Sequence, residues 1–331
     1  MSEHPFAPFV RILGRGKRAR RDLTRDEAQA AMSAILNDGA TDAQLGAFLM
    51  LLRVKEETPE ELAGFIDVVR EQCYGTLRAL PPVHIDWPSY AGKKKHSPWY
   101  LLSARLLSQQ GIKVMMHGGP EHTPQRLYAE QALQQLGLPI ASSIEQAAMQ
   151  LDQLHFCYLP LRHFCPQLDR LLQLREQLGL RSPINTLARS INPAHAQLSL
   201  QSVFHPAYLS LHLGAAELCH DKDLLLIKGE GGEIEWRPDA RNVIQGLQDG
   251  QLIDEVVVDA VISRYTPQSP PSVTDLVTLW RDGDKDQPQL TYGKHAVIHT
   301  AALALSGLQH ARTWDEALAM ASQYWQQRDP L

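Results

Sequence analysis

The first 80 residues carry apolar positions spaced three and four apart, which is the period of a helix that buries one face. Three of these stretches open with a capping box, in which a threonine and an acid or amide three positions later satisfy free backbone N–H groups. The boxes are Thr24 with Glu27, Thr41 with Gln44, and Thr58 with Glu61. The pattern predicts helices that begin near residues 25, 42 and 59. Helices this short bury their apolar faces only against each other or against a second subunit.

From residue 81 the pattern changes to short apolar runs that alternate with helical segments. The expected strands lie at 83–86, 113–116, 156–159 and 224–227, with later ones at 233–236 and 255–258. The expected helices lie at 98–109, 125–135, 143–151, 166–178, 295–306 and 313–325. Strands separated by helices imply a mostly parallel sheet with right-handed crossovers. We therefore predict a small all-α helical domain over 1–80 and a large α/β domain over 81–331, with a mostly parallel central sheet flanked by helices.

Composition narrows the class of protein without identifying it. The chain has 331 residues, of which 44% are hydrophobic and 21% charged, as in ordinary globular proteins. No apolar run approaches the roughly 18 to 20 residues that span a bilayer, and the first residues lack the apolar core of a signal peptide. The four cysteines are scattered, which favours free thiols. We expect a cytoplasmic protein with no membrane partner.

The charge is unevenly distributed along the chain. The net charge is −5, yet residues 1–25 hold seven Lys or Arg against two acids, and residues 215–331 hold ten against eighteen. A basic arm on an acidic body binds an anionic polymer, because the local field acts within roughly 8 to 10 Å. The alternative is an arm that is merely solvated. The arm residues that we expect to contact such a polymer are Arg15, Lys17, Arg18, Arg20 and Arg21.

The loop after the first expected strand, residues 87–96, carries three consecutive lysines: Lys93, Lys94 and Lys95. A loop in this position of an α/β protein commonly holds phosphate on backbone amides, but this one has only one glycine. Aromatic residues flank the lysines, and bases stack on exposed aromatic rings. The sequence predicts a basic, aromatic platform, with a core position for the rings as the alternative. The aromatic residues are Trp87, Tyr90, Trp99 and Tyr100, of which the last two are the better core candidates.

Several motifs in the right order resemble anthranilate phosphoribosyltransferase and the related pyrimidine nucleoside phosphorylases. They include Leu23-Thr-Arg-Asp-Glu-Ala28, Gln44-Leu-Gly-Ala-Phe48, Asn192-Pro-Ala194 and Lys228-Gly-Glu230. The resemblance implies a helical domain that usually forms a dimer interface and a large α/β domain. It also implies that the helical segment around 162–190 returns to the helical domain. In the enzymes, phosphoribosyl pyrophosphate and magnesium lie in the cleft between the domains.

The ligand motifs of that family are changed in this sequence. The pyrophosphate loop, Gly-Thr-Gly-Gly-Asp in the enzymes, corresponds to residues 86–92, where Pro88 lacks an amide donor. The adjacent Asp-Glu pair for magnesium is missing, and Glu233 remains as a weak metal candidate. The family's Leu-Gly-Pro-Leu-Thr-Asn-Pro segment acquires Arg189. By the resemblance, the remnants of the substrate site are Asp86, Ser89, Gly92, His117, Gly118, Gly119 and Arg175.

These changes, together with Ser202-Val-Phe-His-Pro206, resemble the YbiB-type paralogues of the family. That resemblance implies a non-catalytic cytoplasmic homodimer, formed through the N-terminal helices, that binds single- and double-stranded nucleic acid with little sequence preference. Further expected contacts are Arg175, Arg181 and Arg189. We expect no cofactor. The alternatives are a phosphoribosyltransferase with an altered donor or acceptor site, which alone would need magnesium, and a protein-interaction scaffold.

Overall fold

The computed structural model describes residues 3–16 and 18–330. The chain begins with four helices, α1 (Ala7–Gly14), α2 (Arg25–Leu36), α3 (Asp42–Lys55) and α4 (Pro59–Leu77). All three predicted capping boxes form, with each threonine side chain accepting a hydrogen bond from the backbone N–H three residues later. The predicted starts of α2, α3 and α4 are therefore confirmed. Helix α1 carries part of the basic arm and was not predicted.

A central sheet follows, with strand order β3-β2-β1-β4-β5-β6-β7 and with β8 also pairing with β6. Its strands are β1 (Ile85–Ser89), β2 (Val114–Gly118), β3 (Phe156–Pro160), β4 (Leu198–Val203), β5 (Asp223–Lys228), β6 (Asn242–Gln248), β7 (Gln251–Leu252) and β8 (Val256–Val258). The first five strands pair in parallel and the others antiparallel. The predicted mostly parallel sheet is confirmed.

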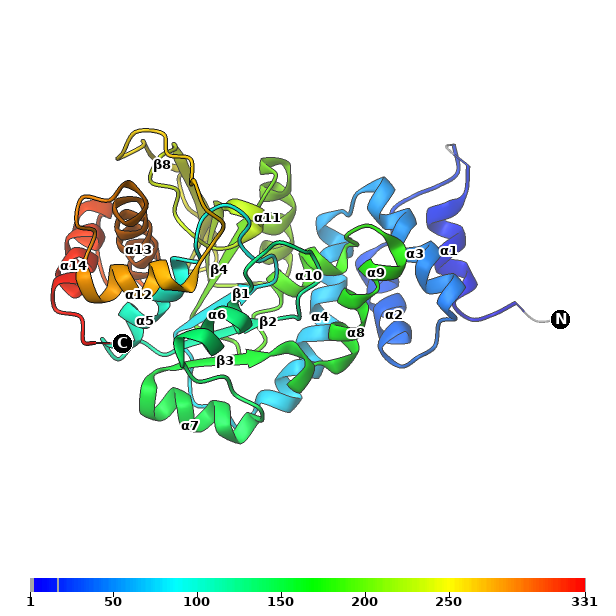
Figure 1. Cartoon of the computed structure of the whole chain (residues 1–331). Helices are drawn as coiled ribbons and strands as arrows, with labels where there is room; N and C mark the ends of the chain where they lie inside the picture. Colours follow the sequence, from blue (N-terminus) through cyan, green and yellow to red (C-terminus); the bar gives the residue numbers. More distant parts are fainter. Residues whose placement is uncertain (1–2, 17, 331) are drawn as a thin grey trace.

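Helices cover both faces of the sheet (Figure 1). They are α5 (Tyr100–Ser108), α6 (Ala129–Leu136), α7 (Ile144–Leu154), α8 (Pro166–Gln173), α9 (Arg175–Leu178), α10 (Ile184–Ser190), α11 (Leu209–Leu218), α12 (Val273–Asp282), α13 (Pro288–Gly307) and α14 (Trp314–Gln326). Because side chains alternate between the faces of a strand, Val114 and Met116 enter the core with α5 and α13, and Met115 enters the other core. The second core continues into the helical domain, where Phe48 belongs to it.

The segment 162–190 forms α8, α9 and α10, and Leu168, Leu171 and Ile184 share their core with Phe48 of α3. Figure 1 shows α8 and α9 beside α2 and α3, at the junction of the two parts of the molecule. The boundary predicted at residue 80 stays a prediction. Within the stretches 3–16 and 18–330, no helix is long and apolar enough to cross a membrane.

The strand predicted at 233–236 is wrong. After a short 3-10 helix at Glu230–Gly232 the chain is irregular, and the apolar-polar alternation has another cause. Glu233 and Glu235 turn toward the loop after β1, where they accept hydrogen bonds, whereas Ile234 and Trp236 pack in the core. The alternating side chains of residues 233–236 are therefore buried in two opposite directions, although the segment pairs with none of the described strands. Strands β4, β6 and β7 were not predicted.

Candidate functional site

The loop after β1 is closed by a carboxylate of the chain itself. Glu233 Oε1 accepts hydrogen bonds from the backbone N–H groups of Ala91 and Gly92, at 2.6 and 2.7 Å. Its Oε2 accepts one from Ser89 Oγ at 2.8 Å. The Glu233 side chain is fully buried. The amides that follow a first strand, where an α/β protein would hold phosphate, are thus occupied by Glu233.

Glu230 occupies the next turn of the same loop. Its carboxylate accepts hydrogen bonds from the backbone N–H of Lys94 at 3.1 Å and of Lys95 at 2.7 Å. It also pairs with His96 Nδ1 at 2.8 Å. Although burial opposes it, the charges of Lys93 and His96 hold the pKa of Glu230 well below its usual range. Two internal carboxylates therefore occupy the backbone N–H groups of Ala91, Gly92, Lys94 and Lys95.

Lys93 is not a surface contact, which corrects the sequence prediction for this residue. It is 1% exposed, and its Nζ lies 2.5 Å from Glu235 Oε1 and 3.3 Å from Glu230 Oε2. A lysine can be buried only when carboxylates compensate its charge, and both partners do so here. Lys94 and Lys95 are exposed, as expected.

The aromatic platform predicted beside the lysines does not form. Trp87, Tyr90, Trp99 and Tyr100 are each at most 1% exposed, so the core alternative is correct for all four. Their rings pack among the side chains of the sheet and its helices. None of them offers a face on which a base could stack.

The expected remnants of the substrate site form buried networks. His117 Nε2 donates to Asp86 Oδ1 at 3.0 Å, because the carboxylate only accepts, and Nδ1 then accepts from the Tyr90 hydroxyl at 2.6 Å. Gly118 ends β2 so close to β1 that an added Cβ would lie 2.3 Å from the Ser89 carbonyl oxygen. Gly119 faces the Tyr90 ring. The structure thus joins Asp86 with His117, and Ser89 with Gly92 and Glu233, away from solvent.

The residues present do not fit a magnesium ion. Both Glu233 oxygens are engaged by the loop, and the next residue is Ile234. Glu235 is engaged by Lys93 and by the Tyr100 N–H. Among the residues that the structure describes, no three His, Cys, Asp or Glu side chains group together as metal ligands would.

Outside the closed loop lies a groove of about 550 Å³, which we call the basic groove. Its basic side chains are Lys94, Lys95, Arg126, Lys228, Arg237 and Arg264. The acids that line it are Glu230, already engaged by the loop, and Asp239, which lies 3.6 Å from Arg264. Phe204 lines the groove and is 51% exposed. The basic groove therefore combines an excess of positive charge with the exposed ring of Phe204.

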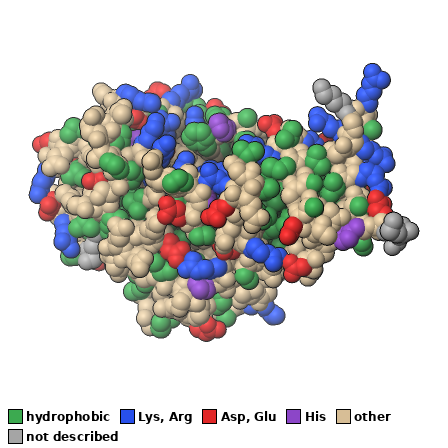
Figure 2. Space-filling view, turned by 45° about the vertical axis from the view of Figure 1, so that its right-hand side comes forward, with side chains coloured by type: hydrophobic (Ala, Val, Ile, Leu, Met, Phe, Trp, Pro, Cys, Tyr) green, Lys and Arg blue, Asp and Glu red, His purple; other side chains and the backbone are tan. Residues whose placement is uncertain are grey.

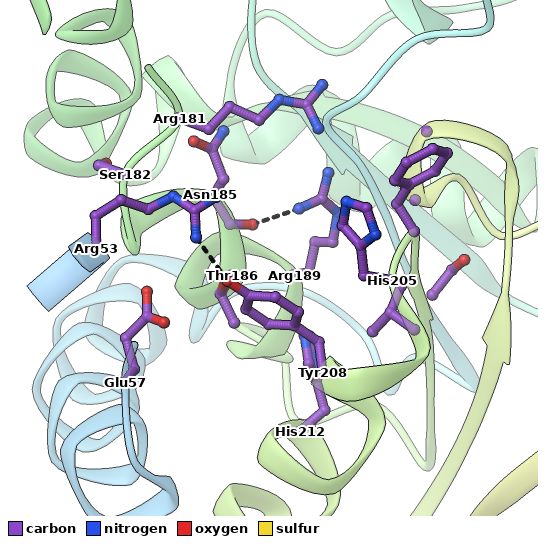
Figure 3. Close-up of a pocket in the computed structure, with 15 residues that line it drawn as sticks. Arg53, Glu57, Arg181, Ser182, Asn185, Thr186, Arg189, His205, Tyr208 and His212 are labelled. Carbon is purple, nitrogen blue, oxygen red and sulfur yellow. Dashed lines mark hydrogen bonds between the residues drawn. The ribbon is translucent and has the colours of Figure 1, made fainter. Parts of the chain in front are cut away.

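A smaller cavity of about 170 Å³, which we call the arginine cavity, adjoins the basic groove through Phe204, His205 and Gly231. Figure 3 shows Arg53, Arg181 and Arg189 reaching into it. Burial, followed by repulsion from Arg189, Arg126 and Arg175, lowers the pKa of Arg181 to about 10. Arg175 itself donates to the His122 carbonyl and to Thr123 Oγ1. The structure thus brings together Arg175, Arg181 and Arg189.

The basic arm lies elsewhere. Arg15, Arg18 and Arg20 are exposed, Arg21 forms a two-pronged ion pair with Glu27 at 2.6 and 2.7 Å, and Lys17 lies outside the described residues. Figure 1 places this arm at the end of the helical domain farthest from the sheet. Figure 2 shows basic side chains gathered at that end. The arm and the basic groove are therefore separate surfaces of one chain.

Sequence reasoning missed most residues of the basic groove. Arg126, Lys228, Arg237 and Arg264 are isolated in sequence and come from four different segments, so no local charge cluster marked them. Phe204 lay within a motif that was noticed for its resemblance alone. The available signal was the alternation of apolar and polar residues over 196–201, directly before the motif, because loops at the carboxyl ends of parallel strands form binding sites.

Comparison with known proteins shows the family of this chain. A model described as the helical bundle domain of the glycosyl transferase family matches residues 11–73, and one described as its a/b domain matches residues 100–327. YbiB of Escherichia coli strain K12 is 32% identical over 241 residues, which cover 70% of this chain and 73% of that protein. Anthranilate phosphoribosyltransferase of Symbiobacterium thermophilum is 28% identical over 331 residues, covering 95% of this chain and 92% of that protein.

Solved structures agree on the fold. Anthranilate phosphoribosyltransferase of Thermus thermophilus has a TM-score of 0.77 at 21% identity, covering 98% of this chain and 94% of that one. The Saccharomyces cerevisiae enzyme, in complex with PRPP and Mg, has a TM-score of 0.78 at 17% identity over the same shares of the two chains. The chain thus belongs to the anthranilate phosphoribosyltransferase-like glycosyl transferase family, with YbiB among its paralogues.

Proposed function

We propose that this protein is a non-catalytic nucleic-acid-binding member of its family, with little sequence preference and with the basic groove as its main contact surface. The observation that carries the proposal is the basic groove itself, where Arg264 pairs with Asp239, the loop engages Glu230, and five further cationic side chains remain. Each phosphate that a Lys or Arg neutralises releases condensed counterions, so that affinity accumulates with contacts. Phe204 adds a ring on which an unpaired base can stack.

The closed loop after β1 supports binding without phosphoribosyl transfer. A pyrophosphate at this position would have to displace Glu233 from two backbone amides and from Ser89. The displaced carboxylate would then be buried without a partner, which is strongly unfavourable. The family's enzymatic activity stays the alternative, and it requires this loop to open.

The proposal includes a cytoplasmic homodimer that forms through the N-terminal helices, as the family resemblance suggests. Val54 at the end of α3 is 79% exposed, which leaves apolar surface on that part of the molecule. Sedimentation velocity at several concentrations tests this part separately. A species that stays monomeric throughout would contradict it.

The central test is oligonucleotide binding, measured by fluorescence anisotropy over a series of salt concentrations. The groove variant replaces Lys94, Lys95 and Lys228 by Gln, and the control variant replaces Lys222, Arg281 and Arg312, which are exposed outside the groove. Lys222 is a close match, because it precedes the amino end of β5 whereas Lys228 ends that strand. We expect the groove variant to lose about 2 units of the slope of log affinity against log salt for single strands.

The control variant should keep the slope of the wild-type protein. Equal losses in the two variants would show that the binding is a diffuse surface effect, and no binding at low salt would remove the proposal. A parallel thermal-shift assay with phosphoribosyl pyrophosphate and magnesium tests the enzymatic alternative. A clear stabilisation there would favour that alternative.

A further inference from the structure

The arginine cavity holds an unusual set of unpaired donors. Arg189 is 8% exposed, and its Nη1 donates to the Asn185 carbonyl at 2.6 Å, but its Nε and Nη2 have no partner among the described residues. Asn185 Nδ2 and Ser202 Oγ in the same lining are unpartnered as well. A buried guanidinium without its hydrogen bonds is costly, so a site of this kind points to an acceptor that is normally bound there.

The surrounding charges are also uncompensated. No carboxylate lies within ion-pair distance of Arg126, Arg181 or Arg189 in the described part of the chain, although Glu233 favours the charge of Arg189 from farther away. Glu57 lines the other side of the cavity, and burial raises its pKa, which favours the neutral acid (Figure 3). Among the described residues, Glu57 is the one acid in the lining of this cavity, against Arg53, Arg181 and Arg189.

Two glycines shape the wall between the arginine cavity and the basic groove. Gly231 and Gly232 have φ values of 69° and 94°, which favour glycine. An added Cβ on Gly231 would lie 2.7 Å from Arg126 Nη1, and one on Gly232 would lie 3.4 Å from Arg189 Nη2. The two glycines thus let the backbone adopt these φ values and pass close to both guanidinium groups.

We propose that Arg181 and Arg189, together with Asn185 and Ser202, bind a phosphate group that carries two negative charges. Guanidinium and amide donors match the several acceptor oxygens of a phosphate. The cavity is far larger than one water molecule needs, yet at about 170 Å³ it is too small for a strand to pass through. The phosphate is therefore either the terminal phosphate of a strand that lies in the adjoining groove or a small free phosphate. Binding of a terminal phosphate of a strand rests on the proposed function, whereas binding of a free phosphate does not.

The test compares oligonucleotides of one sequence that differ only in a terminal phosphate or hydroxyl group, and it titrates inorganic pyrophosphate and phosphate separately by calorimetry without metal. We expect a terminal phosphate to tighten binding at least about tenfold, as one or more charge-assisted hydrogen bonds would. Arg181→Gln removes a half-buried charge that neighbouring arginines repel, so the protein should still fold. The variant should no longer prefer the oligonucleotide with the terminal phosphate. Arg237→Gln in the basic groove should weaken both oligonucleotides and keep their ratio.

The outcomes separate the sources and the two proposals. Pyrophosphate binding that Arg181→Gln removes, with no preference for a strand end, assigns the site to a free phosphate. Equal binding of both oligonucleotides without pyrophosphate or phosphate binding overturns this inference and leaves the proposed function standing. If neither oligonucleotide binds, the proposed function fails and the calorimetry alone decides this site. Arg189→Lys, which keeps the charge but loses the fork of donors, should reduce phosphate binding in a protein that still folds.

Discussion

Lys93 and Lys94 are neighbours in sequence with opposite physical roles. Lys93 lies between Glu230 and Glu235, and its charge balances one partly buried and one fully buried carboxylate. Lys94 is exposed and lines the basic groove. The backbone of the two residues also has different partners. Lys93 forms an antiparallel bridge with Leu127, whereas the N–H of Lys94 donates to Glu230.

Replacing each lysine by Met distinguishes the two roles. Lys93→Met leaves the buried Glu235 carboxylate without its counter-charge, so the free energy of unfolding should fall by about 3 to 5 kcal/mol. Lys94→Met should change stability by less than about 0.5 kcal/mol and should lower the salt slope of oligonucleotide binding by about 0.7. Urea unfolding and anisotropy measure the two quantities. A stable Lys93→Met protein with weakened binding would contradict the buried position.

The sequence could not separate these lysines, because nothing local shows which side chain turns inward. The carboxylates that hold Lys93 lie more than 130 residues away along the chain. The same long range explains why Glu233 was a weak metal candidate from sequence and a hydrogen-bond acceptor for the loop in the structure.

His299 predicts how stability depends on pH. Burial lowers its pKa to about 4, while its Nδ1 donates to the His295 carbonyl at 2.8 Å and its ring stacks on Trp236. The unfolded chain takes up a proton near pH 6.5 and the folded chain does not, so this contribution is present above pH 6.5 and is lost as pH falls toward 4. Between pH 7 and pH 5 the loss should be about 2 kcal/mol.

His299→Phe should remove that part of the pH dependence, because it keeps an aromatic ring without a titrating group. His310→Gln, at an exposed histidine, is the matched control and should keep it. Urea unfolding at several pH values measures both. The hypothesis fails if the His299→Phe protein loses as much stability at pH 5 as the wild type.

The capping boxes at the starts of α3 and α4 follow one pattern but contribute differently to stability. Gln44 at the start of α3 is part of a box on the surface. Glu61 at the start of α4 is fully buried and binds the Leu23 N–H at 2.9 Å and Lys55 Nζ at 2.8 Å, besides Thr58. It therefore joins the end of the basic arm to two helices.

We expect Glu61→Ala to lower the free energy of unfolding by about 3 kcal/mol, since it leaves buried donors unpaired. Gln44→Ala removes the same position of an exposed box and should cost about 1 kcal/mol or less. Thermal or urea unfolding of the two variants measures the difference. Equal costs would show that Glu61 acts only as a cap.

Helix starts were predicted because capping is local, whereas β4 was missed although residues 196–201 alternate apolar and polar side chains. Strand β4, Leu198–Val203, mixes Ser199 and Gln201 into its apolar run, and both polar side chains are buried. Ser199 donates to Asp86 and Gln201 pairs with His212 at 2.7 Å. Alternation is usually read as one buried and one exposed face, and nothing local in the sequence shows that the polar face of β4 is buried as well.

Figure 1 places the arm at the far end of the helical domain, whereas the segments that line the basic groove belong to the α/β part of the molecule. A short strand in the groove of one chain should therefore not reach Arg15, Arg18 or Arg20 of the same chain. A long strand can contact both surfaces, and each contact adds to its salt dependence.

Replacing Arg15, Arg18 and Arg20 by Gln should leave the affinity for an oligonucleotide of about 6 nucleotides unchanged and weaken that for a long one, whereas the groove variant should weaken both. Anisotropy titrations at one low salt concentration measure the four affinities. If the arm variant weakens the short oligonucleotide as much as the long one, one short strand must touch arm and groove together. Since the arm and the groove of a single chain lie apart, the arm would then come from a second copy of the chain. In that case the arm variant should bind the short oligonucleotide as well as the wild type does at concentrations where sedimentation shows only monomer.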